Sequence, residues 1–386
     1  MTNLYLTASQ TENTTPYIFP MTGTGVFSLE EALYHCLHNW RGVTHDFLSE
    51  PFIKWVEGSL GLGKIGASLR EISRIESFSM RFLAFLSVVD YLPKRNLEEL
   101  QKELGQWERQ QVWEKLAEQG DYWAARGEGE RAYSYHARAL NYHEGAKLLN
   151  NAGVALMYTA DYAAAAEHFT KALALESGNK QLNFNLIEAH ILGNSHDAAR
   201  DIINKISANY PNDPELLYFQ AEIHFKSKNY FDAIKLYENA VNLNKDPQYI
   251  YRLCDCYMKM RLYDKALEAI KTVDAQDVSY LRKLAGYYVG AGNVPQAIKS
   301  IEKALVSNVN DAELWITLAG YHRLDLDLGK ASGAITKALS LSAENPAALL
   351  EQARIRKAQG RTKEYQGILG RILARFKRDY REMKIT

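Results

Sequence analysis

One glycine-rich segment has a spacing that could support phosphate chemistry. Residues 58–64, which read GSLGLGK, match a phosphate-binding loop, and the overlapping segment 61–66 matches a dinucleotide fingerprint. Asp90 follows an apolar run, as a magnesium-binding aspartate would. However, Ile65 stands where the loop needs a Ser or Thr hydroxyl, and no succession of strands is present to build a nucleotide-binding sheet. We therefore interpret residues 58–64 as a turn between two helices.

Histidine and cysteine side chains near the N-terminus are the main candidates for metal binding. Four potential ligands lie close together in the sequence: His35, Cys36, His38 and His45. No second Cys/His pair completes a zinc site, so we expect ordinary helix residues and neither a metal nor another cofactor. No local signature of a Ser/His/Asp or Cys/His nucleophile is present either. The sequence thus does not predict an enzyme.

The composition predicts a folded protein rather than a disordered or strongly charged one. The chain has 386 residues, 46 basic and 46 acidic side chains, and 47% hydrophobic residues. A net charge of zero gives no bulk electrostatic reason to expect nucleic acid or membrane binding. Three cysteines do not form a disulfide framework. The first twenty residues lack the features of a signal peptide, and no apolar run is long enough to span a bilayer. We therefore expect a cytoplasmic protein without membrane insertion.

A repeated pattern occupies about two-thirds of the chain. A small residue recurs at Ala132, Ala165, Ala199, Ala233, Ala266, Ala297 and Ala331, with Tyr365 in the eighth place, and the separations are 33, 34, 34, 33, 31, 34 and 34 residues. Within each unit, apolar residues keep the spacing of two amphipathic helices joined by a polar turn. A regular period of this length is the signature of a repeat architecture, so we predict an all-α fold.

The repeat resembles the tetratricopeptide repeat. One unit carries Gly153, Tyr162, Ala165, Phe169 and Ala172 at the positions that this motif uses. The resemblance implies an α-α superhelix, a solenoid of about eight helical pairs over residues 113–376. Some positions depart from the motif: Tyr365 replaces an alanine, and His190, His224 and His322 occupy a position usually filled by tyrosine or leucine.

Three further segments flank the predicted solenoid. We expect residues 1–25 to be irregular, residues 26–112 to form an N-terminal helical bundle, and residues 377–386 to form a basic C-terminal tail. The segment 25–39 also resembles the leader of uncharacterised tetratricopeptide proteins of anaerobic Gram-positive bacteria. That resemblance carries no assigned activity.

The family resemblance also implies where a partner binds. In tetratricopeptide proteins the second, fifth, sixth and ninth positions of each first helix face a concave groove. Here these positions give a mixed set of amide, aromatic and charged side chains: Asn150, Asn151, Phe184, Asn185, Glu188, Tyr218, Phe219, Glu222, Tyr251, Arg252, Asp255, Arg282 and Lys283. The amides can hydrogen-bond a peptide backbone, and the aromatic rings supply contact area.

The sequence therefore predicts a non-catalytic protein-interaction scaffold that binds a peptide or partner helix of unknown identity. An alternative remains open, because residues 352–386 contain eleven Lys and Arg side chains against three acidic ones. Such a basic end could contact nucleic acid, as could the N-terminal bundle. It could equally be the solvated face of a terminal helix. The pattern does not indicate an oligomeric state.

Overall fold

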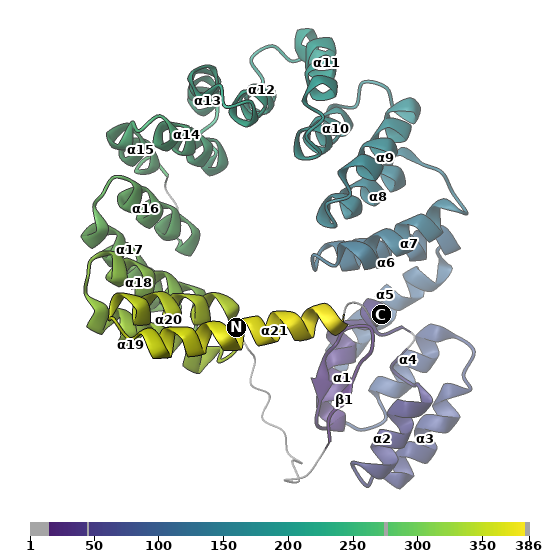
Figure 1. Cartoon of the computed structure of the whole chain (residues 1–386). Coiled ribbons are helices and arrows are strands. Elements are labelled where there is room, and N and C mark those ends of the chain that lie inside the picture. Colours follow the sequence, from purple (N-terminus) through teal and green to yellow (C-terminus); the bar gives the residue numbers. More distant parts are fainter. Residues whose placement is uncertain (1–14, 45, 274–276, 383–386) are drawn as a thin grey trace. The chain divides into compact units, whose positions relative to one another are not determined.

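The structure is a computed structural model that describes residues 15–44, 46–273 and 277–382, with side chains described up to residue 374. The chain divides into two compact units, residues 1–199 and 200–386. Each consists mainly of antiparallel helix pairs (Figure 1).

The first unit begins with a small hairpin that the sequence did not predict. Strands β1 (Tyr17–Ile18) and β2 (Gly25–Val26) pair antiparallel, with Tyr17 opposite Val26. Gly23 has a φ of +67°, which favours glycine, and the Gly23 N–H donates to Phe19 O at 2.8 Å. The Phe19 side chain is fully buried. The prediction of an irregular segment 1–25 is therefore wrong for this part, while residues 1–14 lie outside the described residues.

Helices make up most of the described part of residues 26–112, the predicted N-terminal bundle. Its elements are α1 (Leu29–His38), the 3-10 helix η1 (Trp40–Gly42), α2 (Glu50–Gly58), α3 (Gly63–Ser73), α4 (Phe78–Leu86) and α5 (Lys94–Arg109). The core contains edge-to-face aromatic pairs, such as Phe47 with Phe82, whose ring centroids lie 4.7 Å apart. The Ser28 hydroxyl caps α1 by accepting from Glu31 N–H at 3.2 Å.

The segments that suggested phosphate or metal chemistry have structural roles here. The glycine-rich segment 58–64 covers the end of α2 and the start of α3, as the helix-turn interpretation predicts. His35 Nε2 lies 2.9 Å from Thr22 Oγ1, and Cys36 is buried. His45 lies outside the described residues. Within the described part of the chain, no group of three or more His, Cys, Asp or Glu side chains is arranged to hold a metal ion.

Eight helix pairs follow, and they confirm the predicted all-α fold. In the first unit they are α6 (Val112–Ala124) with α7 (Gly129–Leu140), α8 (Ala146–Tyr158) with α9 (Tyr162–Leu175), and α10 (Lys180–Leu192) with α11 (His196–Ile206), whose end passes into the second unit. The seven repeated alanines are fully buried, because each lies where two helices approach closely.

The second unit continues the same construction. After a short 3-10 helix, η2 (Ser207–Asn209), its pairs are α12 (Pro214–Lys226) with α13 (Tyr230–Leu243), α14 (Pro247–Lys259) with α15 (Tyr263–Ile270), α16 (Val278–Gly290) with α17 (Val294–Ser307), α18 (Ala312–Leu324) with α19 (Leu328–Leu341), and α20 (Pro346–Ala358) with α21 (Thr362–Glu382). Helix α21 passes the predicted end of the solenoid at residue 376, so the basic tail begins as helix.

The turn inside each pair has one residue in the left-handed region. Their φ values lie between 59° and 74°, except for Gly292, whose φ is 78°. The eight residues are Gly127, Ala160, Asn194, Lys228, Arg261, Gly292, Leu326 and Gly360. They follow the same period as the alanines. Because only three of the eight are glycine, the fold imposes this conformation even where the side chain disfavours it.

Candidate peptide-binding site

A hollow of 410 Å³ lies in the first unit between the first helices of two successive pairs, α6 and α8. Its lining comes mainly from α6, from the turn before α8 and from α8 itself. The lining residues are Gln110, Trp113, Glu114, Ala117, Glu118, Asp121, His143, Gly145, Ala146, Lys147, Leu148, Asn151 and Glu176. We call this hollow the α6–α8 cavity.

The α6–α8 cavity lies at the positions that the family resemblance assigns to the groove. Counting from Trp113, the second, fifth, sixth and ninth positions of the first unit are Glu114, Ala117, Glu118 and Asp121, and all four line it. Their spacing places them on one face of α6. The small Ala117 side chain leaves the space that its larger neighbours surround. The sequence prediction began its groove residues one repeat later, at Asn150, and so missed these four.

The cavity has an aromatic wall. The rings of Trp113 and His143 stack with centroids 4.3 Å apart and planes inclined by 26°. Trp113 belongs to the first turn of α6, and His143 lies in the segment between α7 and α8. This stack presents apolar area beside the polar groups, a combination that suits ligand recognition.

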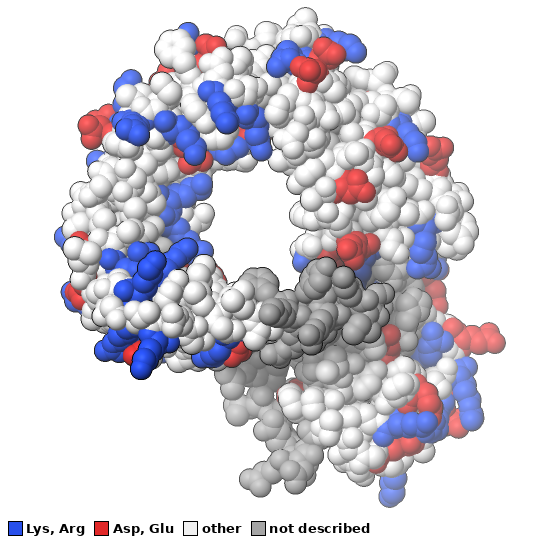
Figure 2. Space-filling view, in the orientation of Figure 1, with Lys and Arg blue, Asp and Glu red and all other residues white. Residues whose placement is uncertain are grey.

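Four carboxylates surround the cavity, and their contacts are mostly with uncharged groups. Glu114 accepts from Gln111 N–H at 2.7 Å, Asp121 accepts from Asn151 Nδ2 at 2.9 Å, and Glu176 accepts from Asn179 Nδ2 at 3.0 Å. Glu118 accepts from the Gln110 amide and from Arg41, whose Nη2 lies 3.3 Å away. On the face drawn in Figure 2, acidic atoms are visible over the regions of α6 and α8.

A buried histidine lies behind Asp121. His136 of α7 has no exposed surface, and its ring packs so closely on α6 that a Cβ at Gly120 would lie 2.5 Å from it. Its Nε2 lies 3.5 Å from Asp121 Oδ1, and among the described residues neither ring nitrogen has a hydrogen-bond partner. Burial lowers the pKa of His136, and the Asp121 charge partly opposes that shift.

The other groove residues predicted in the first unit are divided between surface and core. Asn185 Nδ2 donates to Asn150 Oδ1 at 2.7 Å, which joins α10 to α8. Asn151 reaches Asp121 of α6, and Glu188 is exposed. Phe184, however, is only 1% exposed, so its predicted role as a contact for a partner is wrong. An aromatic ring at this position gains more by packing between neighbouring helices than by facing water.

In the second unit the predicted groove residues bind one another. Glu222 of α12 is 5% exposed and receives a forked contact from Arg252 of α14 and a hydrogen bond from Tyr237. Phe219 is also only 5% exposed. We therefore correct the prediction that Glu222 and Phe219 face a partner. A carboxylate in this position must be paired internally, because burying it unpaired would be costly.

The remaining predicted residues of the second unit are partly exposed but also engaged. Tyr287 donates to Asp255 Oδ1 at 2.9 Å, and Arg282 pairs with Asp311 at 3.1 Å. The other contacts are a Lys283 ammonium 4.9 Å from the Tyr251 ring centroid and a Gln248 amide donating to Tyr218 OH at 2.9 Å. These contacts link successive first helices into a polar ladder.

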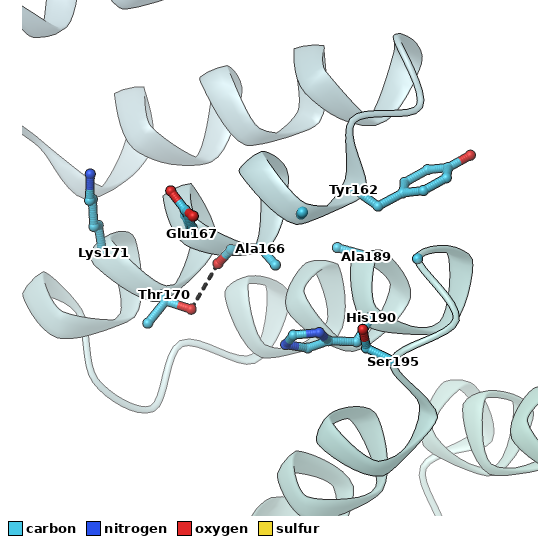
Figure 3. A pocket seen from close by; sticks show the side chains of 10 residues that line it. Tyr162, Ala166, Glu167, Thr170, Lys171, Ala189, His190 and Ser195 are labelled. Carbon is cyan, nitrogen blue, oxygen red and sulfur yellow. Dashed lines mark hydrogen bonds between the residues drawn. The ribbon is translucent and has the colours of Figure 1, made fainter.

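A larger hollow, of 510 Å³, lies outside the groove positions (Figure 3). It separates α9 side chains such as Glu167 and Lys171 from His190 of α10. A hollow of 320 Å³ occurs one repeat later beside His224. Both histidines occupy the position that the motif usually fills with tyrosine or leucine. Small side chains line much of the 510 Å³ hollow, so we interpret it as a packing gap.

In the basic C-terminal segment, each arginine whose side chain is described contacts a carboxylate. Arg354 pairs with Glu351, Arg371 pairs with Glu344, and Arg356 and Arg361 both approach Glu364. This pattern matches the solvated face of a terminal helix.

Lys and Arg dominate another region, that of α13 to α16, on the face drawn in Figure 2. In the described part of the chain, no helix is both long and apolar enough to cross a membrane.

Comparison with known families identifies the repeat. Residues 156–223 match the tetratricopeptide repeat family model, and residues 193–273 match the model of subunit 3 of the anaphase-promoting complex, or cyclosome. The chain is 29% identical over 191 residues to cellulose synthase operon protein C of Pseudomonas fluorescens (strain SBW25). That alignment covers 45% of this chain but only 15% of the relative, so the chain spans a small part of the relative's length.

Solved structures with a similar fold include several repeat proteins. A tetratricopeptide repeat protein from Parabacteroides merdae ATCC 43184 is 17% identical, with a TM-score of 0.46, over 64% of this chain and 99% of that one. YrrB, described as having an unusual peptide-binding site, is 16% identical, with a TM-score of 0.38, over 48% of this chain and 98% of its own.

Proposed function

The chain is a tetratricopeptide repeat protein, and from this premise we propose that it is a non-catalytic scaffold that binds an extended segment of a partner protein along α6 and α8. One observation carries the proposal: the α6–α8 cavity opens at the groove positions of the first repeat. Stacked repeats of this kind present a continuous surface on their first helices.

The polar groups beside the cavity suit a peptide backbone. Asn150 and Asn151 continue from the cavity along α8, and Asn185 extends the row to α10. Each amide has two donor hydrogens and an acceptor oxygen with two lone pairs, so its contacts within the protein leave further hydrogen-bonding capacity. An extended chain offers one N–H and one C=O per residue to such a row. The cavity would then receive one side chain of the bound segment.

Selection from a displayed library of random peptides tests this function on the full chain. Retained peptides are expected to bind the original chain but not Ala117→Trp, in which an indole fills the α6–α8 cavity. Ala174→Trp, on the exposed surface of α9, is the matched control and should bind normally. If the retained peptides bind Ala117→Trp as well as they bind the original chain, or if no peptide is retained, the proposal is wrong.

The alternative function, contact with nucleic acid, has less support. The described arginines of the C-terminal segment are occupied by carboxylates. Retention of the chain on immobilised DNA at low salt, lost on removing residues 371–386, would favour this alternative, because phosphate contacts depend steeply on salt.

A further inference from the structure

We propose that the α6–α8 cavity is specific for a positive charge, so that the partner segment inserts a Lys or Arg side chain, or its own N-terminal ammonium group. This inference rests on the proposed function and adds the chemistry of the partner. It is carried by three features of the cavity: its uncompensated charge, the buried polar groups behind its wall, and its aromatic stack.

The charge of the lining is strongly one-sided. Glu114, Glu118, Asp121 and Glu176 share the lining with a single Lys, Lys147, and with His143. Glu118 is paired with Arg41, which is shared with Glu103. In the described chain the other three carboxylates form no ion pair with Lys or Arg. A cation entering the cavity would gain from all four, whereas a carboxylate would be repelled.

Buried polar groups beside the cavity lack partners. The fully buried His136 ring directs Nε2 toward Asp121, a lining carboxylate, and has no hydrogen-bond partner at either nitrogen. Gln110, which lines the cavity, donates its amide N–H to Glu118 while its own oxygen is buried and unpartnered. Buried polar atoms without partners are rare in folded proteins and call for an explanation. Of these atoms, the Gln110 oxygen belongs to a lining residue, so a bound donor-rich group would donate to it as well as to Asp121 and Glu118.

The aromatic wall favours the same ligand. A cation over the face of an indole is attracted by the ring quadrupole, most strongly where water is excluded. The Trp113 ring lies at the edge of the cavity with its orientation held by the His143 stack. A Lys or Arg side chain can place its methylene stem on such a wall while its charged end reaches the carboxylates. The volume of 410 Å³ lies within the range of about 300–1,000 Å³ found for small-ligand pockets.

Peptides selected on the full chain as described above provide the test. The retained sequences are expected to share one Lys or Arg at a fixed position or to need a free N-terminus. For a Lys-containing peptide, replacing that Lys with norleucine, which keeps the stem and removes the charge, should weaken binding at least about tenfold, as expected for a charge-assisted hydrogen bond. Acetylating the N-terminus distinguishes the two sources of charge.

Two variants of the chain test the same charge specificity by changing the cavity instead of the peptide. Asp121→Asn and Glu118→Gln should each weaken binding of the charged peptide several-fold and leave the norleucine peptide unaffected. Glu130→Gln, an exposed carboxylate of α7 outside the cavity, is the matched control and should change neither. Circular dichroism and urea unfolding of each variant confirm that the fold is retained.

The possible failures are distinguishable. Peptides that lose binding in Ala117→Trp but bind equally well with norleucine or with an acidic residue would overturn the charge specificity and leave the proposed function intact. Peptides insensitive to Ala117→Trp would overturn both.

Discussion

The two units use the same helix-pair repeat but treat their equivalent groove positions differently. In the first unit, Asp121 at the ninth position of its repeat meets the uncharged Asn151 at the sixth position of the next repeat. In the second unit, Glu222 at the ninth position of α12 meets Arg252 at the sixth position of α14. The first arrangement leaves a cavity with negative charge, and the second forms a buried ion pair. The repeat fold therefore sets where the groove positions lie, but the residues at those positions determine what they contact.

The difference extends to the net charge of the units. Summed over the whole sequence, residues 1–199 carry 17 basic and 24 acidic side chains, a net charge of −7, and residues 200–386 carry 29 and 22, a net charge of +7. The neutral total conceals an acidic and a basic half. We expect the acidic half to attract a cationic partner over a distance of about 8–10 Å at physiological ionic strength.

Removing the arginine partner of the buried Glu222 carboxylate in the second unit should have the greatest effect. Arg252→Met leaves the buried Glu222 carboxylate with Tyr237 as its remaining partner, and we expect the free energy of unfolding to fall by about 3–5 kcal/mol. Urea unfolding followed by circular dichroism measures this change. Arg282→Met, which removes a partly exposed pair with Asp311, should cost no more than about 1 kcal/mol. Equal costs for the two variants would contradict the contrast between buried and exposed pairs.

A second substitution should give the groove of the first unit an arginine–carboxylate contact like the one in the second unit. Asn151→Arg places a guanidinium beside Asp121, at the position that Arg252 holds relative to Glu222. We expect binding of a cationic peptide to weaken by about tenfold, or about 1.4 kcal/mol, because the new charge occupies the carboxylate that the ligand needs. Fluorescence anisotropy with a labelled peptide measures this change in binding. The isosteric Asn151→Asp should not weaken binding, and a loss in both variants would argue against an electrostatic cause.

The left-handed turns provide a comparison with a smaller effect. Leu326 has a φ of 63° and is 83% exposed, so it gains little from packing. Leu326→Gly should raise the free energy of unfolding by about 1 kcal/mol, since glycine adopts this conformation without steric cost. The equivalent Gly292→Ala should lower it by a similar amount. Thermal unfolding of the two variants should shift in opposite directions, and shifts of the same sign would refute the conformational explanation.

The smallest effect concerns acid sensitivity in the first unit. Burial, aided by the Arg126 charge, lowers the pKa of His35 to about 4. The unfolded chain takes up a proton near pH 6.5, whereas the folded chain does so only near pH 4, so the free energy of unfolding should fall as the pH falls through that interval. His35→Gln should reduce the difference between urea midpoints at pH 7.5 and pH 5. The exposed His38→Gln is the control and should leave that difference unchanged.

Much of the fold was predictable because the repeat is a local and periodic signal. The alanine ladder, the helix pairs and the turn at residues 58–64 follow from residue spacing alone. The β1–β2 hairpin was not predictable, since its strands have two residues each and depend on the burial of Phe19. Residue spacing gives the groove positions, but it does not give the exposure of the side chains at those positions. Phe184 and Phe219 lie at counted positions and are buried because neighbouring helices cover them.

The repeat, its helical period and the residue types at each groove position can be read from residue spacing, because they depend on contacts between residues close along the chain. Which of those residues stay accessible depends on how the helices pack in three dimensions. Asp121 and Glu222 have the same place in the repeat, yet one borders a cavity and the other is buried under Arg252 and Tyr237. The outcome depends on side chains about 30 residues apart that meet only when successive first helices pack together.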